Sequence, residues 1–451
     1  MEPVSQAAAH LSRTAQRFLE YVTSDPELMR PLHHLAAGDY FASLQSWPTF
    51  VDGEKLAEIR RATVGLTRLV KSIPERIFGN DAGKIAAYYG LHNEALIALL
   101  LHPPTGLDGV LVRNDFVDTP DGLKCLEVNA GMIGGWQLRY FEQRVLAHPV
   151  IARFLKGEGV TPHYRDPLAV MMQFIIDQNL GKPIAASGVL NLAITMNKLT
   201  PPPGEDARLS RMYRGMLDAT GTGLTGEVVL CSCADLSRRQ GQIWYRDRRP
   251  IQALVQMSDE DLPGVVFQTF KAGRLSLYNG PISALLNQKQ TLALLSERVD
   301  SAELTADERD LLRRHLPWTR AAGPGAATFR GETRALPDLL IAHREELVLK
   351  PALGYQGRGV AFGHLTPPDA WARLVAEAVA QGGWLVQERA DSRPYVYQCG
   401  EQGYGTYDVA WGTFCFGESY GGGFLRMLPR GAGDGVINSA RGASEGLLFE
   451  V

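Results

Sequence analysis

The segments Arg113-Asn114-Asp115 and Glu127-Val128-Asn129 decide the fold of this chain. They lie in two stretches, GVLVRNDFV (109–117) and LKCLEVN (123–129), that both read as β-strands. The intervening Thr119-Pro120-Asp121-Gly122 is typical of a tight turn, because Pro suits its first central position and Gly its left-handed one. The sequence therefore predicts a β-hairpin that carries one cation, two carboxylates and a carboxamide.

The register of this hairpin determines which side chains meet. A three-residue loop closed by a bulge would place Thr119 opposite the residue that follows the turn glycine. Carried down the ladder, this register puts Asp115 opposite Glu127 and Arg113 opposite Asn129, with all four on one face. Two directly opposed carboxylates repel each other unless a cation lies between them. The pattern thus favours a magnesium and phosphate site, and the alternative is a surface hairpin whose charges face water.

A second informative segment lies far downstream. Residues 346–350 (ELVLK) read as a buried strand that ends at Lys350, and a glycine-rich loop follows. Glycines let backbone N–H groups approach phosphate oxygens, and lysine adds a compact positive charge. The loop is not a Walker sequence, and the next segment reads as a strand (360–363), which does not suit a dinucleotide fingerprint. A structural β-turn remains the alternative. The predicted phosphate contacts in the loop are Gly354, Gln356, Gly357 and Gly359.

After a helix-like stretch (368–380), residues 383–388 (GWLVQE) form a short apolar strand that ends in polar residues. Such a strand can offer its backbone to the edge of an adenine ring. The residues expected there are Leu385, Val386, Gln387 and Glu388.

Together these pieces resemble the ATP-grasp superfamily, in its lysine-bearing strand at Lys350, its glycine-rich loop and its Gln-Glu hinge. Most members carry the metal carboxylates after the lysine segments, whereas here Asp115 and Glu127 come first. The order therefore resembles a circular permutation. The resemblance is closest to the permuted group that includes the synthetase part of glutathionylspermidine synthetase, where an Arg-x-Asp hairpin leads to Glu-x-Asn-Ala at the same spacing.

Further segments carry the same resemblance, which covers roughly residues 105 to 445. A hairpin at 241–251, the first lysine segment at Asn287-Gln-Lys289 and the segment 316–320 match in order. Residues 421–426 and 436–442 are similar to the final core strands of the family.

The resemblance implies bound ATP and one or two Mg²⁺ ions. Lys289 and Lys350 would hold phosphates, while Asp115, Glu127 and Asn129 would hold the metal. Arg113 and Arg426 would act on the transferring group. Arg441 is left open between a functional and a surface role.

Two departures from the group concern the substrates. Residues 253–257 (ALVQM) replace a segment that usually carries an arginine, and 130–136 (AGMIGGW) replaces a Thr-Pro-rich segment. Glutathione and spermidine are therefore not carried over as substrates.

The implied fold is α/β (α+β), an ATP-grasp core in circularly permuted order with a small α/β pre-ATP-grasp domain and a helical N-terminal region. The predicted divisions are 1–104 (helical), 105–160 (metal-binding hairpin), 161–280 (small α/β domain) and 281–451 (lysine, loop and hinge segments). Two apolar helix faces support the first division. They comprise Leu56, Ile59, Leu66, Leu69 and Val70, and Ile85, Tyr89, Leu96 and Leu99.

Composition excludes several function classes. The formal net charge of −3 and the absence of a long basic run argue against nucleic acid as a partner. We find no secretory signal and no apolar segment of membrane-spanning length. Five cysteines without paired spacing indicate reduced thiols and a cytoplasmic location. The oligomeric state is not readable.

The function that the resemblance implies is an ATP-dependent carboxylate–amine ligase. A small acid would be activated as an acyl phosphate, and an amine would capture it to release ADP and phosphate. Two alternatives stay open. One is a phosphotransferase with the same ATP site, and the other is a non-catalytic nucleotide-binding protein.

Overall fold

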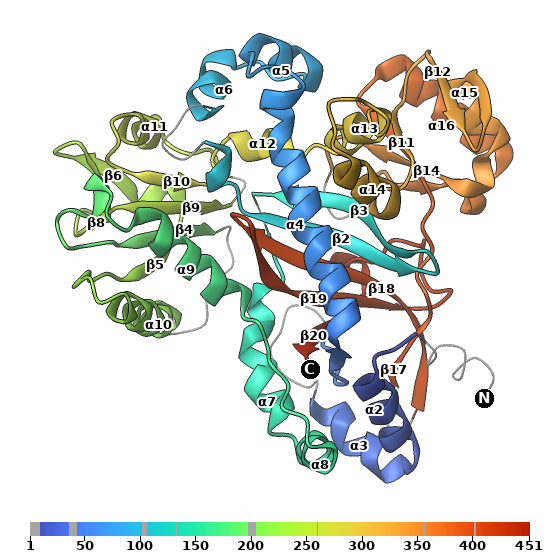
Figure 1. Cartoon of the computed structure of the whole chain (residues 1–451), viewed down its shortest axis with the longest axis horizontal. Helices are drawn as coiled ribbons and strands as arrows, with labels where there is room; N and C mark the ends of the chain where they lie inside the picture. The colour runs from blue at the N-terminus through green and yellow to red at the C-terminus, as the bar shows by residue number, and fades with distance from the viewer. Residues whose placement is uncertain are drawn as a thin grey trace.

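The computed structural model describes residues 10–35, 43–101, 106–131, 133–196, 204–258, 260–354, 357–400 and 403–451. Three sheets organise this part of the chain (Figure 1). A large central sheet lies between a parallel sheet built from the middle of the sequence and a smaller antiparallel sheet built from residues 319–388.

The central sheet has the order β1-β20-β19-β18-β2-β3, with β17 also paired to β18. Only β1 and β20 run parallel, and the other pairs are antiparallel. Strands from both ends of the chain therefore share one sheet. Their bounds are β1 (Thr49–Val51), β2 (Val112–Thr119), β3 (Gly122–Ala130), β17 (Tyr395–Cys399), β18 (Gly403–Phe416), β19 (Ser419–Pro429) and β20 (Ser444–Glu450).

The β2–β3 hairpin has the predicted pairing at its functional end, with Asp115 opposite Glu127 and Arg113 opposite Asn129. The predicted bulge at the turn is wrong, because Thr119 pairs with the turn glycine itself. The Thr119 hydroxyl accepts a hydrogen bond from the backbone N–H of Asp121 and donates to the carbonyl of the turn glycine, which stabilises a two-residue turn. The extra residue lies instead at the register shift beside Asp115, so the functional pairs are the same in both registers.

Helix α4 (Gly53–Arg76) crosses the face of the central sheet that carries Asn114 (Figure 1). The Asn114 side chain donates to the Thr63 carbonyl and the Thr67 hydroxyl of this helix. Because side chains alternate along a strand, Arg113 and Asp115 point to the other face. The predicted apolar face of α4 is buried, as expected.

The second predicted helix face in the N-terminal region is wrong as a single helix. Gly90 adopts a left-handed conformation (φ 65°) and ends α5 (Ala82–Tyr89), and α6 (Glu94–Leu101) starts anew. Ile85 and Tyr89 are buried, whereas Leu96 is only partly covered. The remaining helices near this region are α2 (Arg13–Thr23), α3 (Pro26–Leu35), α7 (Glu142–Leu146) and α8 (Pro149–Glu158).

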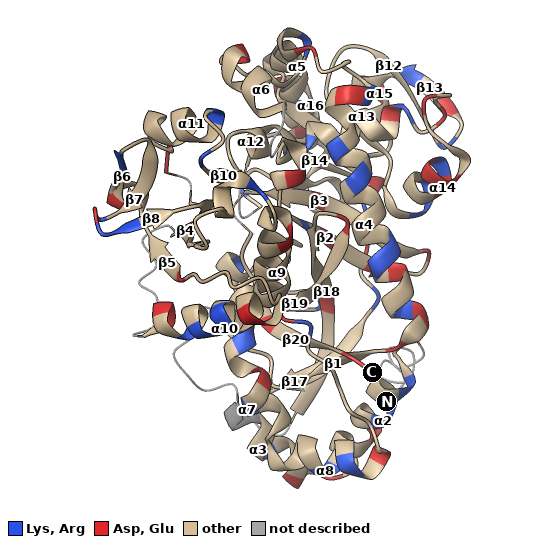
Figure 2. Ribbon diagram, turned by 60° about the vertical axis from the view of Figure 1, so that its left-hand side comes forward, with Lys and Arg blue, Asp and Glu red and all other residues tan. Residues whose placement is uncertain are grey.

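The parallel sheet has the order β10-β9-β4-β5 and is covered by helices. The Asp166 side chain caps α9 by accepting from the Leu168 N–H, as the Asp-Pro signal predicts. A three-stranded ribbon at the periphery carries exposed basic residues, while α10 carries arginines between the acidic residues near its two ends (Figure 2). The bounds are β4 (Leu192–Met196), β5 (Val228–Cys231), β9 (Ala253–Met257), β10 (Ser276–Tyr278), α9 (Pro167–Asn179), α10 (Glu205–Ala219), α11 (Gly264–Lys271) and the ribbon β6 (Leu236–Arg239), β7 (Gln242–Tyr245) and β8 (Arg249–Ile251).

The small antiparallel sheet has the order β11-β16-β14-β15 and its own apolar core around Trp371. A hairpin and two helices complete this unit, and three helices join it to the rest. The bounds are β11 (Thr319–Ala321), β14 (Leu347–Pro351), β15 (Ala361–Phe362), β16 (Trp384–Glu388), the hairpin β12 (Ala326–Phe329) and β13 (Glu332–Ala335), α15 (Leu336–Ala342), α16 (Pro368–Gln381), α12 (Ile282–Leu286), α13 (Gln290–Glu297) and α14 (Ala306–His315).

The prediction of a core strand at 436–442 is wrong. The segment holds a short 3₁₀ turn (Ser439–Arg441), and the final strand is β20. No helix in the described ranges is both long and apolar enough to span a membrane.

Candidate active site

A cleft with a volume of about 510 Å³ opens between the central sheet and the small sheet. Its lining comes from β2, β3, β14, β15, β16, β18 and β19, from Lys289 and Gly354, and from the segments 357–365, 390–392 and 430–438. No described residue of the N-terminal region lines it, so that region covers the opposite sheet face and not the cleft. The cleft brings together these predicted site residues: Asp115, Glu127, Lys289, Lys350, Gly354, Gly357, Gln387, Glu388 and Arg426.

Asp115 is the centre of the charge cluster at the inner end of the cleft. Its carboxylate accepts two hydrogen bonds from Arg113 (2.8 and 3.0 Å) and lies 2.8 Å from Nη2 of Arg426. The Asn129 carboxamide nitrogen donates to the same carboxylate at 2.9 Å. Burial alone would raise the pKa of Asp115, but the two guanidinium groups outweigh it and lower the pKa to about 2. Asp115 is therefore a buried anion held between two cations.

Phe424 of β19 supports both arginines. The guanidinium carbons of Arg113 and Arg426 each lie 5.6 Å from the centroid of its ring. The ring occupies space that side chains at Gly135 and Gly412 would need, since a Cβ at either position would lie 2.2 and 2.4 Å from ring carbons. Gly135 in the divergent 130–136 segment and Gly412 of β18 thus make room for the Phe424 ring beside the two arginines.

The two predicted lysines approach the same cleft from different elements. Nζ of Lys289 lies 2.8 Å from a Glu127 oxygen and donates to the Gly354 carbonyl at 3.0 Å. Nζ of Lys350 donates to Oε1 of Gln387 at 2.6 Å. Burial lowers the pKa of Lys350 to about 8, with Glu127 opposing the shift and Lys289 adding to it. Both ammonium groups are thus desolvated beside one carboxylate.

The glycine-rich loop is only partly at the cleft. Gly354 and Gly357 line it, whereas Gly359 packs against Pro351 and does not. Gln356 lies outside the described residues. Gly357 has φ +68°, and a Cβ there would lie 2.4 Å from Val436 of the loop that follows β19. The small sheet and the central sheet therefore touch at a position where only glycine fits.

The prediction that Leu385 and Val386 offer their backbone to a base is wrong. β16 pairs with β11 on one side and β14 on the other, so both residues lie inside the sheet and are buried. Gln387 turns its side chain to Lys350. The cleft is lined instead by the end of the strand, at Gln387 and Glu388, and by residues 390–392 after it.

The chemistry of the donor set fits a hard divalent cation. Carboxylate and carboxamide oxygens are the ligands that Mg²⁺ prefers, and Asp115, Glu127 and Asn129 lie on adjacent strands. The Asn129 carboxamide uses its nitrogen on Asp115, which leaves its oxygen as a ligand atom. Within the described ranges, no group of three or more His, Cys, Asp or Glu side chains is arranged to hold a metal. A cation here would thus depend on the carboxamide and on a bound phosphate.

Several cleft residues escaped the sequence reasoning. Asp391, Ser392, Asp408 and Arg430 line the outer end, where Arg430 lies 3.5 Å from Asp408. The signal for Asp408 was the period-2 alternation of β18, which becomes readable only once the facing strand is known, whereas Asp391, Ser392 and Arg430 lie in the segments that follow β16 and β19, where no periodicity marks them. Arg441 pairs with Asp434 and does not line the cleft.

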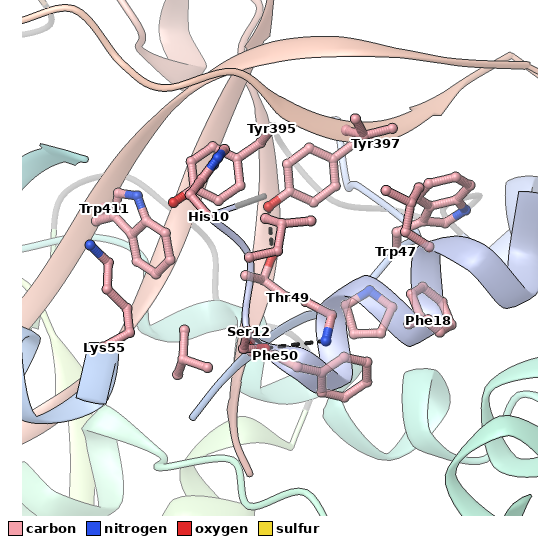
Figure 3. Close-up of a pocket in the computed structure, with 16 residues that line it drawn as sticks. His10, Ser12, Phe18, Trp47, Thr49, Phe50, Lys55, Tyr395, Tyr397 and Trp411 are labelled. Carbon is pink, nitrogen blue, oxygen red and sulfur yellow. Dashed lines mark hydrogen bonds between the residues drawn. The ribbon is translucent and has the colours of Figure 1, made fainter. Parts of the chain in front are cut away.

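A second, much smaller pocket lies between β17 and the N-terminal segment (Figure 3). Its volume of about 40 Å³ suits a few water molecules. Aromatic side chains, among them Tyr395, Tyr397 and Trp411, surround it. Among the described residues, Lys55 carries the only ammonium group that lines it, and this group pairs with Asp118 at 2.5 Å. The large cleft is therefore the candidate active site.

Comparison with models of protein families gives no match, and neither does comparison with curated proteins. Among solved structures, the chain is similar to a glutathione synthetase-like effector from Globodera pallida, at 12% identity over 98% of this chain and 99% of that chain, with a TM-score of 0.56. A putative gamma-glutamylcysteine synthetase from Methylobacillus flagellatus aligns at 12% identity over 86% and 88% of the two chains, with a TM-score of 0.41, too low to carry an argument. The chain thus shares the mixed α/β fold of a glutathione synthetase-like protein.

Proposed function

We propose that this protein is an ATP-grasp enzyme that joins a carboxylic acid to an amine at the expense of ATP. The observation that carries the proposal is the charge of the cleft. Three cations of its lining (Lys289, Lys350 and Arg426), with Arg113 behind Asp115, meet the carboxylates of Asp115 and Glu127 at its inner end. The excess of desolvated positive charge in the lining suits a polyphosphate chain.

The position of the nucleotide follows from this charge distribution. The phosphates would lie on Lys289, Lys350 and the loop at Gly357. The base would enter the apolar outer part between Val348 and Leu428, beside the segment that follows β16. The backbone N–H and C=O of Ala390 have no backbone partner among the described residues, so they remain free to bind the edge of a base.

The order of the segments supports a circularly permuted ATP-grasp core. The carboxylate hairpin β2–β3 precedes both lysines in the chain, yet it pairs with β18, which follows them. The fold shared with a glutathione synthetase-like protein supports an ATP-dependent ligase more generally.

The chemistry needs no covalent enzyme intermediate. A carboxylate oxygen of the acid attacks the γ-phosphorus, the bond to the bridging oxygen breaks, and ADP leaves. The amine nitrogen then attacks the acyl carbon, phosphate leaves, and one proton is released. Arg426 would hold the transferring group through charge-assisted hydrogen bonds, and Arg113, which donates to Asp115 and to the Gly134 carbonyl, would act through Asp115. When bound at Asp115, Glu127 and Asn129, Mg²⁺ would neutralise phosphate charge.

Partners and location follow from the same residues. The substrates would be a small acid and a small amine, since the cleft has a volume of about 510 Å³. All five cysteines are free thiols, and four are buried, which supports a reducing, cytoplasmic compartment.

Phosphorus NMR of the protein with Mg-ATP tests the proposal. Pools of amino acids, small peptides and polyamines serve as acids and amines. ADP and phosphate that form only when an acid and an amine are both present would establish the ligase. A new phosphate ester would show a phosphotransferase, AMP with pyrophosphate would show adenylate chemistry, and an unchanged spectrum without a shift in melting temperature would exclude nucleotide binding.

A further inference from the structure

We propose that Gln387 is a positioning residue, whose buried carboxamide holds the Lys350 ammonium in the cleft and leaves its positive charge free for phosphate. The inference rests on the proposed function and adds a residue role to it. The sequence pattern had assigned Gln387 to the adenine ring, and its contacts point elsewhere.

The sheet register brings the two side chains together. Gln387 pairs with Val348 and Lys350 pairs with Leu385, so Gln387 and Lys350 are diagonal neighbours on the cleft face of the small sheet. Nζ of Lys350 donates to Oε1 of Gln387 at 2.6 Å. Gln387 is 1% exposed, so this contact is shielded from water.

A second contact sets the orientation of the carboxamide. Thr319 pairs with Gln387 from the other side of β16 and is completely buried. Its hydroxyl donates to the Pro317 carbonyl at 2.8 Å, so its lone pairs face the Gln387 side chain and accept from Nε2 at 3.2 Å. If the carboxamide were flipped, its NH₂ group would face the Lys350 ammonium group. Both groups are donors and neither can accept a hydrogen bond, so this contact would be lost. The three hydrogen bonds that link Lys350, Gln387, Thr319 and Pro317 therefore all run the same way, from donor to acceptor in that order.

The choice of an amide has a chemical consequence. A neutral carboxamide fixes the ammonium without cancelling its charge, whereas a carboxylate in the same place would form an ion pair. The only other acceptor of Lys350 among the described residues is the Leu126 carbonyl at 3.4 Å. Both acceptors belong to the protein and are neutral, so the charge of Lys350 remains available to a ligand.

The test compares ADP with adenosine, which lacks phosphates. Binding of each to the wild type, Gln387→Met and Gln387→Glu is measured by calorimetry and ligand-observed NMR in the presence of Mg²⁺. Both variants are expected to weaken ADP binding by about tenfold, the effect of losing a hydrogen bond to a charged group. Adenosine affinity should change by less than about twofold, since its base does not touch Gln387.

Two further proteins make the result specific. In a Lys350→Met background, Gln387→Met should no longer change ADP affinity, because the two residues act through one contact. Gln252→Met removes a buried, hydrogen-bonded glutamine in the parallel sheet and should leave the ratio of ADP to adenosine affinity unchanged.

An equal loss for ADP and adenosine would overturn the inference and assign Gln387 to the base. Unchanged ADP affinity in both Gln387 variants, or a full effect of Gln387→Met without Lys350, would overturn it as well. Failure of the wild type to bind either ligand would instead defeat the proposed function.

Discussion

Arg426 Nη2 lies 2.8 Å from Asp115 Oδ2, with both side chains buried. The contact joins β19 to β2 across β18, which separates the two strands in the sheet. The guanidinium groups of Arg113 and Arg426 and the carboxylate of Asp115 thus form a single buried unit. This unit makes Asp115 part of the stability of the sheet as well as of the cleft.

Asp115→Asn should therefore destabilise the protein as well as abolish turnover. The change leaves two buried guanidinium groups without their counter-charge, which costs about 3–5 kcal/mol in comparable sites. Urea unfolding at pH 7 measures the loss. Asp121→Asn, in the exposed turn of the same hairpin, is the control and should change stability by less than about 0.5 kcal/mol. Wild-type stability in Asp115→Asn would contradict the buried unit.

Lys350→Met should stabilise the fold while it weakens nucleotide binding. Burial lowers the pKa of Lys350 from 10.5 to about 8, so between these pH values the unfolded chain binds one more proton and stability rises with pH. Below pH 8 the charged amine is present in both states and its desolvation cost is complete.

The replacement should therefore add about 1–3 kcal/mol to the free energy of unfolding at pH 7 and flatten the rise above pH 8. Unfolding curves at pH 7 and pH 10 test both points. The exposed Lys84→Met is the control. If the free energy of unfolding of Lys350→Met still rises above pH 8, the rise belongs to another titrating group.

Glu127→Gln should change nucleotide binding in opposite directions with and without metal. Without Mg²⁺, ADP should bind more tightly, because one negative charge near the phosphates is gone. With Mg²⁺, ADP should bind more weakly, because a ligand of the cation is lost. Calorimetry in EDTA and in Mg²⁺ gives the two constants. Asp391→Asn, at the outer end of the cleft, should show no such reversal. If Glu127→Gln changes ADP affinity equally in EDTA and in Mg²⁺, Glu127 is not a ligand of the metal.

Gly357→Ala should weaken ADP binding by about tenfold, because the new methyl group meets Val436 and opens the contact between the two sheets. A second change, Val436→Ala, should restore part of the affinity. Gly159→Ala is the control for backbone strain, since it has φ +65° with no atom near its Cβ position. If Val436→Ala gives no recovery, the contact does not control the cleft.

The sequence predicted those features whose signal is local. The hairpin register, the cap at Asp166, the strand ending at Lys350 and the helix before β16 depend on neighbours within a few residues. The prediction of a bulge at the turn failed, because the Thr119 hydroxyl forms two hydrogen bonds that stabilise a two-residue turn.

Other errors came from a competing local signal and from a strand that is distant in the sequence. Residues 85–99 keep a helical spacing of apolar side chains, but Gly90 ends the helix because its left-handed conformation outweighs the pattern. In the sequence, Leu385 and Val386 read as part of an edge strand whose backbone a ligand can reach. In the structure, β11 pairs with that edge, so both residues lie in the interior of the sheet.

The sequence by itself determined which groups are available for the chemistry, namely the two carboxylates, the carboxamide, the lysines and the arginines, and the short-range register of the hairpin. Only the tertiary structure decided how they combine: Arg426 beside Asp115, Lys289 beside Glu127 and Gln387 under Lys350. The physical reason is that alternation along one strand defines a face, whereas the partner of that face depends on which distant strand buries it.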